Sequence, residues 1–540
     1  MKILLLQPPI QDFYDTDVRL QPIGLAYLKS SLLKYVDGVE VKILDLHRGH
    51  GRHTVKVPRE LNYLKEYYKY DDRSPFCGFN NFFHYGASWE KIEKLINLES
   101  PDVVGISSLF SPYYREVVSV ASLAKKAGEA IGKTITIVVG GSHANAMPES
   151  LLASCYIDYV ICGEGEKSFC DLISKLKSGN APEQRLVPAS ENFRLDEIPF
   201  PDLSDFSLDN YLYEGRPMTF MVTSRSCPHR CSFCSVHNTF GASYRRRNVK
   251  SVLEEIRLRY RQGFRVIDFE DDNLTFYKKE MTELCENLIK EFPNQEMELV
   301  AMNGISYLSL DRNLLRLMKR AGFTRLNLSL VSSDKTVLES TKRPHTIEQY
   351  LEIVNTAFEL GFKVTSYQIL GLPFETLESM VQTMAFAAKL PVLLGASPFY
   401  LTPGSPIALQ LGNKNTTESV VRARLTAMAN ETNFLNRNQL YTLFITTRII
   451  NFIKGLKFDS DRRELRGLDI LRHLFAKKEL LADTSMGFKV IDRFDVGLFF
   501  KIFEELDFVT KIDGQPFLSS ALRENYQLPD GRADDRHGQL

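Results

Sequence analysis

The feature that most constrains this 540-residue chain is a group of three cysteines, Cys227, Cys231 and Cys234, spaced Cys-x3-Cys-x2-Cys. Thiolates bind soft metals, and iron–sulfur cubes are commonly held by four cysteines, one for each iron. Because no fourth cysteine lies near these three, the spacing predicts a cluster with one iron left open to a substrate or cofactor. An open coordination position is typical of a catalytic metal centre.

Two other interpretations of the three cysteines stay open at this stage. A structural zinc ion could take the same thiolates with His229 or His237 as its fourth ligand. The cysteines could also be buried as small apolar residues without any metal. The surrounding sequence favours the catalytic centre, because the apolar run Met218–Ser224 predicts a strand that ends at the cysteine loop. Barrel-like α/β folds place their chemistry at the C-terminal ends of strands.

The cysteine loop, with Phe233 directly before its last cysteine, resembles that of the radical S-adenosylmethionine (SAM) superfamily. The resemblance implies a [4Fe-4S] cluster held by Cys227, Cys231 and Cys234, with SAM chelating the open iron. It also implies an electron donor such as a flavodoxin or ferredoxin. One electron then cleaves SAM to methionine and a 5′-deoxyadenosyl radical, which abstracts hydrogen from a substrate. In such an enzyme the protein positions the reactants, while the cofactor supplies the chemistry.

Composition and charge restrict the expected binding partners and the expected cellular compartment. Lys plus Arg equals Asp plus Glu at 67 each, so no charge excess indicates nucleic acid or an acidic membrane surface as a partner. The sequence holds no apolar run of about 18 residues, which predicts no membrane-spanning helix. Its apolar start is too short for a signal peptide. Eight cysteines in so long a chain do not indicate a disulfide framework, and we expect a cytoplasmic protein with a small-molecule substrate.

Residues 1–180 alternate short apolar strands with helices, which predicts a doubly wound, Rossmann-like parallel sheet of an α/β protein. The expected strands are Lys2–Gln7, Glu40–Asp45, Asp102–Ser107, Thr134–Val139 and Asp158–Cys162. Such sheets bind ligands at the C-terminal ends of their strands. The last three strands end in runs of small residues, which let the backbone approach a large flat ligand closely.

Ser107-x-Leu109 followed by Gly140-Gly141 resembles two of the three motif pieces of cobalamin-binding domains. A domain of this kind before a radical SAM core is the layout of the cobalamin-dependent radical SAM enzymes. The resemblance implies cobalamin contacts at Ser107, Leu109, Gly140, Gly141, His143 and Gly163. His143 is either a neighbour of the corrin or an ordinary histidine that stabilises its loop.

The third motif piece, Asp-x-His-x-x-Gly, is absent from the expected place. The loop after the first strand, residues 7–12, reads Gln-Pro-Pro-Ile-Gln-Asp and contains no histidine. We therefore expect that no histidine of this motif binds the cobalt.

Three further segments carry weaker signals. Residues 46–87 form a long, aromatic insertion, which we expect to lie over the cofactor pocket as a lid or as a contact between domains. Its histidines His47, His50 and His53 could bind a metal, although a polar loop is the commoner explanation.

The run 163–168 partly resembles a phosphate-binding loop, but its two carboxylates would repel phosphate. This run instead predicts the start of a helix. Residues 181–215 contain several prolines and predict a linker.

Residues 216–410 show a second alternation of strands and helices, matching the partial (β/α)6 barrel that the radical SAM resemblance implies. The six expected strands are Met218–Ser224, Arg265–Glu270, Met297–Met302, Arg325–Leu330, Lys363–Gly371 and Leu393–Leu401.

The resemblance also implies SAM contacts at Phe233, Asp272, Ser329 and Gly371. A carboxylate at position 272 suits the SAM amino group, although Asp is also common at a helix N-cap. Ser329 could equally be a small packing residue. The turn that starts at Gly371 resembles the Gly-Leu-Pro-Gly-Glu-Thr turn of the family, with Phe374 in place of a glycine.

Residues 411–540 are predicted to form a helical C-terminal region that closes the open side of the barrel, with helices at Glu418–Asn433, Leu440–Ile453 and Val496–Phe508. Taken together, the sequence predicts a cobalamin-dependent radical SAM enzyme that methylates an unactivated carbon. Radical ring formation or rearrangement, as in the anaerobic cyclases of the same layout, is the alternative enzyme activity. A cluster-bearing redox sensor without turnover is the alternative of another class.

Overall fold

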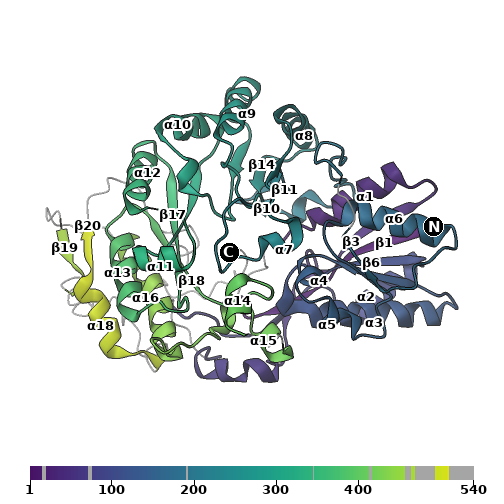
Figure 1. The fold of residues 1–540 in the computed structure, drawn as a ribbon, viewed down its shortest axis with the longest axis horizontal. Helices are drawn as coiled ribbons and strands as arrows, with labels where there is room; N and C mark the ends of the chain where they lie inside the picture. Colours follow the sequence, from purple (N-terminus) through teal and green to yellow (C-terminus); the bar gives the residue numbers. More distant parts are fainter. Residues whose placement is uncertain are drawn as a thin grey trace, which may run out of the picture.

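The computed structural model describes residues 1–14, 20–70, 76–189, 193–344, 346–412, 416–455, 464–468 and 493–509. Two lobes lie side by side in it (Figure 1). The N-terminal lobe, purple to blue in the ribbon, holds one parallel sheet. The other lobe holds the barrel strands, with the C-terminal helices against them.

The N-terminal sheet has six parallel strands in the order β3-β1-β6-β7-β8-β9. The strands are β1 (Lys2–Gln7), β3 (Glu40–Asp45), β6 (Val103–Ser107), β7 (Thr136–Gly140), β8 (Tyr159–Ile161) and β9 (Leu186–Val187). The first five correspond to the predicted strands, and β9 is an edge strand from the segment predicted to be a linker. Because the strand order reverses between β1 and β6, a crevice for ligands is expected at their C-terminal ends.

Helices cover both faces of this sheet, as the doubly wound prediction requires. They are α1 (Ile23–Tyr35), α2 (Trp89–Glu99), α3 (Tyr114–Ala130) and α6 (Gly165–Lys177). Alternate residues of β1 enter two separate cores: Ile3 and Leu5 pack with residues of α1 and α6, whereas Leu4 and Leu6 pack with residues of α2 and α3. This alternation follows from the two-residue period of a strand. The predicted fold class is confirmed for this lobe.

The second lobe contains the six predicted barrel strands. They are β11 (Arg216–Met221), β14 (Val266–Phe269), β15 (Glu298–Val300), β16 (Arg325–Val331), β17 (Lys363–Leu370) and β18 (Leu393–Pro398). β11, β14 and β15 pair in parallel, as do β16, β17 and β18. Single parallel bridges, Leu299 with Phe323 and Ile305 with Leu328, join the two groups. The partial (β/α)6 barrel is therefore confirmed.

Helices pack outside the barrel strands (Figure 1). They are α8 (Val249–Arg261), α9 (Lys278–Glu291), α10 (Arg312–Ala321), α12 (Ile347–Glu359) and α13 (Leu377–Ala388). At the end of the barrel, α16 (Arg437–Gly455) covers the last strand. The Asn451 side chain accepts a hydrogen bond from Leu394 N at 2.9 Å and donates one to Leu394 O at 2.8 Å. The side chain thus satisfies backbone groups of β18, which would otherwise be an open edge.

The predicted helix Glu418–Asn433 is wrong. The chain forms only α15 (Thr417–Val421) and a 3-10 turn at Leu425–Ala427. The helix stops because Arg424 is buried in contacts with the N-terminal lobe, and because Met428 adopts a φ of 43°. The predicted helix Val496–Phe508 is correct only as far as Glu505, since Asp507–Val509 forms strand β20.

The insertion at residues 46–87 is a contact between the lobes. It contributes β4 (Arg52–Thr54) and β5 (Phe83–Tyr85), which form a small antiparallel sheet with β2 (Ile10–Asp12), and a 3-10 helix at Arg59–Glu66. The Tyr68 hydroxyl donates a hydrogen bond to the Thr426 carbonyl at 2.8 Å. Other aromatic side chains of the insertion enter the main core of the second lobe.

The three histidines of the insertion have separate partners. His47 Nδ1 lies 3.4 Å from the Tyr85 carbonyl, and His50 Nε2 lies 3.2 Å from the Asp45 carbonyl. His53 stacks on His84 with a ring separation of 4.8 Å. The three rings engage different groups, which favours the interpretation as a polar loop.

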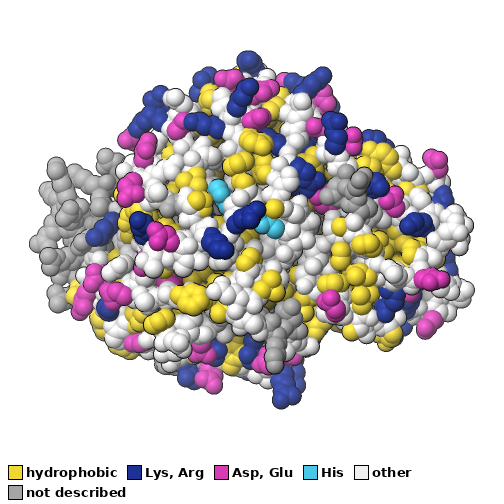
Figure 2. Space-filling model, viewed as in Figure 1, with side chains coloured by type: hydrophobic (Ala, Val, Ile, Leu, Met, Phe, Trp, Pro, Cys, Tyr) yellow, Lys and Arg dark blue, Asp and Glu magenta, His cyan; other side chains and the backbone are white. Residues whose placement is uncertain are grey.

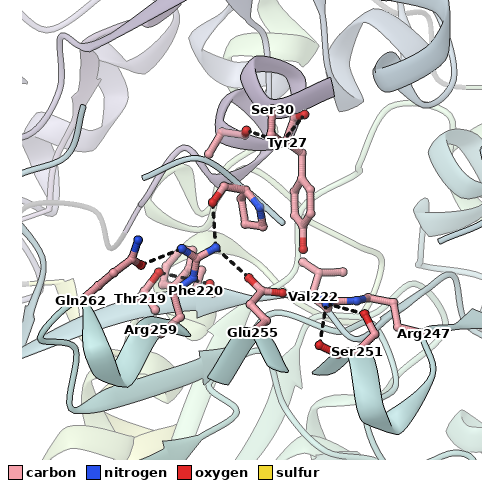
Figure 3. A network of polar contacts seen from close by, with 12 residues as sticks. Tyr27, Ser30, Thr219, Phe220, Val222, Arg247, Ser251, Glu255, Arg259 and Gln262 are labelled. Atoms are coloured by element: carbon pink, nitrogen blue, oxygen red, sulfur yellow. Dashed lines mark hydrogen bonds and ion pairs between the residues drawn. The ribbon is translucent and has the colours of Figure 1, made fainter. Parts of the chain in front are cut away.

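Charged networks are buried where the lobes meet. Figure 3 shows one of them, in which Glu255 on α8 accepts hydrogen bonds from Arg259 at 3.0 Å and from Arg247 at 2.5 Å. Arg259 also donates to the Pro201 carbonyl at 2.7 Å, so α8 is tied to the segment before the barrel. A second network pairs Asp12 with Arg424 at 3.0 Å.

We expect Asp12→Asn to destabilise the protein strongly. Asp12 is 0% exposed and its loss of charge would leave the buried Arg424 uncompensated, at a cost of about 3–5 kcal/mol. The matched control is Glu359→Gln, because Glu359 pairs with Arg312 on the surface and such pairs contribute about 0–1 kcal/mol. Denaturant unfolding of both variants measures the difference, and equal effects would contradict a structural role for the buried pair.

Candidate active site

The cysteine loop lies between β12 (Ser224–Arg225) and α7 (Val236–Phe240), beyond the C-terminal end of β11. Ser226, directly before the first cysteine, adopts a φ of 73°. Two hydrogen bonds hold this left-handed turn: Ser226 N donates to Asp272 Oδ2 at 3.0 Å, and Ser226 Oγ donates to the Gly241 carbonyl at 2.6 Å. The turn directs the chain from the barrel strand into the loop.

The three cysteines are free thiols with different exposures. Cys231 is buried, Cys227 is half-buried, and Cys234 is open to solvent. Asn273 Nδ2 lies 3.5 Å from Cys227 Sγ, and Arg343 Nη1 lies 3.8 Å from Cys231 Sγ. Burial raises the pKa of the Cys227 thiol, the His229 backbone and Asn273 lower it by hydrogen bonding, and the neighbouring Cys231 raises it. The thiols therefore lie close enough to interact and have donors that would stabilise thiolates.

The donor set fits an iron–sulfur cluster better than zinc. Among the residues that the structure describes, no three His, Cys, Asp or Glu side chains surround a position for a single ion. A zinc site needs such convergence, whereas each cysteine of a cubane binds a different iron. His237, one of the two proposed zinc ligands, directs Nε2 to the Cys227 carbonyl at 2.7 Å. His237 is thus engaged by the backbone of the cysteine loop.

Phe233 anchors the cysteine loop. Its ring packs against an apolar cluster formed by Val331, Val337, Leu338, Leu372, Phe399 and Ile407. The neighbouring Ser232 donates its N–H to the Thr341 carbonyl and accepts a hydrogen bond from Ile407 N, both at 2.9 Å. These contacts hold the loop from two sides.

Asp271 and Asp272 at the end of β14 have different roles. Asp271 is buried and accepts hydrogen bonds from the backbone and side chain of Thr223. Asp272 is open to solvent but has protein on most sides, and this desolvation raises its pKa to about 6, against the effect of the Ser226 N–H. The N-cap alternative for Asp272 is wrong, because the N-cap of α9 is Tyr277.

Ser329 and Gly371 lie at the C-terminal parts of their barrel strands. Ser329 is half-buried on β16, and its carbonyl accepts a hydrogen bond from Arg343 at 2.6 Å. Since Arg343 also approaches Cys231, this arginine connects β16 to the cysteine loop. Gly371 adopts a φ of 81°, and a Cβ there would lie 2.8 Å from Leu435. Only glycine fits that position without strain.

Phe374, in the turn after Gly371, is unusual. It adopts a φ of 74° and is 60% exposed, at the place where the resembling family turn has glycine. A bulky side chain in the left-handed region is strained. The adjacent Glu375 is buried, which raises its pKa to about 8, and it accepts a hydrogen bond from Ser332 at 3.1 Å.

The predicted cobalamin loops fit a large ligand at the C-terminal edge of the N-terminal sheet. Gln7 Oε1 at the end of β1 and Ser108 Oγ after β6 are buried and have no hydrogen-bond partner among the described residues, and they follow neighbouring strands at the reversal of strand order. Gly141 has a φ of 115°, and a Cβ there would lie 2.7 Å from the Ser108 carbonyl. Unpaired polar atoms beside glycine-lined backbone indicate a ligand site.

The other predicted cobalamin residues lie on the same loops. Ser107 is half-buried at the end of β6, and Leu109 is 37% exposed just beyond it. A Cβ at Gly140 would have no atom nearer than 3.8 Å, whereas Gly163 adopts a φ of 79° and a Cβ there would lie 2.5 Å from Ala189.

His143 is fully buried on α4 (Ser142–Ala146), and both ring nitrogens have partners. Nδ1 lies 3.0 Å from Ser111 Oγ, and Nε2 lies 2.9 Å from Ser150 Oγ. Burial lowers its pKa to about 4, so the ring is neutral at physiological pH. This arrangement favours the loop-stabilising interpretation over a role beside the corrin.

The structure brings the cysteine loop and the glycine loops together. Helices α4 and α7 are neighbours between the lobes (Figure 1). Asn145 on α4 donates to the Gly141 carbonyl at 3.0 Å and approaches Thr239 Oγ1 on α7 at 3.5 Å. Figure 2 shows histidine and basic side chains in the middle of this face, over the region between β17 and α7. Two cavities of about 530 and 270 Å³ lie elsewhere on the surface, and neither is lined by the cysteine loop.

Comparison with known families gives two domain matches. The radical SAM superfamily profile matches residues 221–387, and the B12 binding domain profile matches residues 78–173. The chain therefore contains a radical SAM domain and, before it, a B12-binding domain. The predicted family, the fold class and the cofactors [4Fe-4S], SAM and cobalamin are thereby confirmed.

Relatives of this radical SAM protein include an uncharacterized methyltransferase, PH0819, from Pyrococcus horikoshii, which is 29% identical over 73% of this chain and 79% of the relative. Cytidylyl-2-hydroxyethylphosphonate methyltransferase from Streptomyces wedmorensis is 29% identical over 69% of this chain and 73% of that enzyme. Anaerobic magnesium-protoporphyrin IX monomethyl ester cyclase from Rubrivivax gelatinosus is 27% identical over 61% of each chain.

Two solved structures have the same fold. The cobalamin-dependent SAM radical enzyme OxsB with aqua-cobalamin bound gives a TM-score of 0.60 at 15% identity and covers 88% of this chain and 71% of OxsB. The radical SAM methyltransferase TsrM from Kitasatospora setae gives a TM-score of 0.56 at 18% identity and covers 76% of this chain and 75% of TsrM.

Within the described residues, no helix has the length and apolarity needed to span a membrane.

We expect Phe374→Gly to raise the stability of the radical SAM protein relative to Phe374→Ala. Both substitutions remove the exposed ring, but only glycine removes the Cβ that makes a φ of 74° unfavourable, an effect of about 1–2 kcal/mol. Thermal unfolding of the two variants measures the difference. An alanine variant as stable as the glycine variant would contradict strain at this turn.

Proposed function

We propose that this protein is a cobalamin-dependent radical SAM methyltransferase that methylates an unactivated carbon of a small-molecule substrate. The observation that carries the proposal is the position of the three-cysteine loop beside the glycine loops of the B12-binding domain, with Asn145 between them. When bound, the cluster, SAM and cobalamin supply radical and methyl-transfer chemistry. The chain supplies their sites and keeps these sites adjacent.

The proposed roles follow from the chemistry of each group. Cys227, Cys231 and Cys234 hold the cluster, because they are free thiols on one anchored loop. Asp272 is accessible and would pair with the SAM ammonium group through charge-assisted hydrogen bonds. Phe233 positions the cysteine loop through its apolar contacts.

The remaining proposed contacts come from glycines, small residues and one exposed leucine. Ser329 and Gly371 would contact SAM from the barrel. The proposed cobalamin contacts are Ser107, Leu109, Gly140, Gly141 and Gly163, together with the buried polar atoms of Gln7 and Ser108.

The names of the relatives favour methylation. Two of those described are named methyltransferases, and the third is named a cyclase. Radical ring formation is therefore the second candidate function. In either case the reaction needs a one-electron donor, such as a flavodoxin or ferredoxin, and we place the protein in the reducing cytoplasm.

We expect Cys231→Ala to abolish reductive cleavage of SAM. Loss of one cluster ligand removes the iron site that SAM needs, so 5′-deoxyadenosine should no longer form in the anoxic, reduced protein. The control is Cys155→Ala, because Cys155 is exposed on the N-terminal lobe outside the cysteine loop. Chromatography of the reaction measures the nucleoside. Continued SAM cleavage by Cys231→Ala would contradict the assignment of this ligand.

Methylation is tested with SAM labelled in its methyl group. If the protein is a methyltransferase, we expect the label in the cobalamin fraction of the wild-type protein, even without substrate. Cleavage of SAM with an unlabelled cobalamin fraction would contradict methylation and favour ring formation.

A further inference from the structure

Four charged side chains meet between the two lobes. Arg225 on β12 and Arg245 on β13 (Arg245–Arg246) come from the barrel lobe, and Glu164 and Glu166 come from the loop and helix after β8. Arg225 pairs with both glutamates, and Arg245 pairs with Glu164. Arg225, Glu164 and Glu166 are all at most 7% exposed. We call these four residues the interlobe clamp.

The two glutamates of the clamp compensate a pair of like charges within the barrel lobe. Arg225 and Arg245 are direct partners in the antiparallel pair of β12 and β13. Like charges placed opposite each other destabilise such a pair. Glu164 and Glu166 balance the two positive charges, and Glu166 is also favoured in the first turn of α6 by the helix dipole. The strand that leads into the cysteine loop is therefore stabilised by the other lobe.

Arg225 favours the charged form of Glu166 despite burial. Burial alone would raise the pKa of Glu166, but the Arg225 guanidinium lowers it below its usual value. Removing one partner would leave another charge buried without compensation, which proteins tolerate poorly.

Both sides of the clamp are joined directly to the proposed cofactor loops. Arg225 is followed by Ser226, whose left-handed turn leads to Cys227. Glu164 follows Gly163 at the end of β8. The Arg225 guanidinium also lies 5.8 Å from the Tyr27 ring of α1 and 5.7 Å from the Phe240 ring of α7, so it contacts both lobes through aromatic faces as well.

We propose that the interlobe clamp sets the separation between the cluster site and the cobalamin site, with Arg225 as its central positioning residue. This inference rests on the proposed function, in which SAM at the cluster has to reach cobalamin as well. A small displacement of two reacting groups lowers the reaction rate by a large factor. A clamp that fixes both loops would keep the two sites at one spacing.

The test uses the full-length protein, purified without oxygen in the presence of cobalamin. Glu166→Gln removes one charge with little change of shape, and Arg225→Lys keeps the charge but removes the planar fork. The matched control is Glu255→Gln, since Glu255 is buried at the same contact between the lobes and binds two arginines, but both arginines belong to its own lobe, so this substitution removes no charge pair across the lobes. Iron and cobalt are measured first. Electron paramagnetic resonance then measures the linewidth of the cobalt signal. The reduced cluster is paramagnetic and broadens this signal more strongly the closer it lies to the cobalt.

We expect Glu166→Gln and Arg225→Lys to keep both metals but to lose the broadening seen in the wild-type protein, whereas Glu255→Gln keeps it. If Arg225→Lys fails to fold, Glu166→Gln alone decides. Unchanged broadening in Glu166→Gln with both metals bound would overturn the positioning role and leave the proposed function intact. Loss of iron or cobalt from Glu166→Gln would also overturn the positioning role, because the clamp would then be needed to bind a cofactor and not to set the distance between the two sites. A wild-type protein without cobalt would overturn the proposed function itself.

Discussion

The structure depends on the contact between the C-terminal edges of two parallel α/β units. Loops that follow β1, β6, β7 and β8 meet the barrel lobe and the segment after it, so polar and charged groups are buried there by necessity. Two of them are compensated across the contact: Arg424 pairs with Asp12 and donates to the Pro112 carbonyl at 3.0 Å, and the Gln21 side-chain oxygen accepts a hydrogen bond from Phe220 N at 2.7 Å. A buried interface of this kind is stable only if both lobes supply their partners.

This arrangement explains why the loops proposed to hold the cofactors are adjacent. Parallel strands expose their backbone and loops at the C-terminal edge, where ligands bind in both doubly wound sheets and barrels. When two such edges face each other, ligands held by either one are brought together. The insertion also packs against helix α16, since Tyr68 and Phe79 lie in the same apolar core as Phe444.

The parts of the fold that could be predicted have local signals. The continuous apolar run of Ile3, Leu4, Leu5 and Leu6 predicts a strand buried on both faces, and the spacing of Cys227, Cys231 and Cys234 after a predicted strand indicates a metal-binding loop. The glycine at position 141 suits its φ of 115°, and a Cβ there would lie 2.7 Å from the Ser108 carbonyl oxygen.

The missed features depend on contacts between residues far apart in the chain. Arg225 and Glu166 are 59 residues apart, and each alone is typical of a solvated surface. Arg424 has apolar and charged neighbours that suit a helix, but its partner Asp12 lies 412 residues away and its burial ends the helix early. His143 could not be interpreted without Ser111 and Ser150, which occupy both of its nitrogens.

The most direct test of the central claim is the metal content of the protein after anoxic purification with cobalamin supplied. An open-site cubane with one corrin predicts about four iron atoms and about one cobalt atom per chain. Iron without cobalt would contradict the role assigned to the N-terminal lobe, and zinc in place of iron would contradict the assignment of Cys227, Cys231 and Cys234 to a radical SAM cluster.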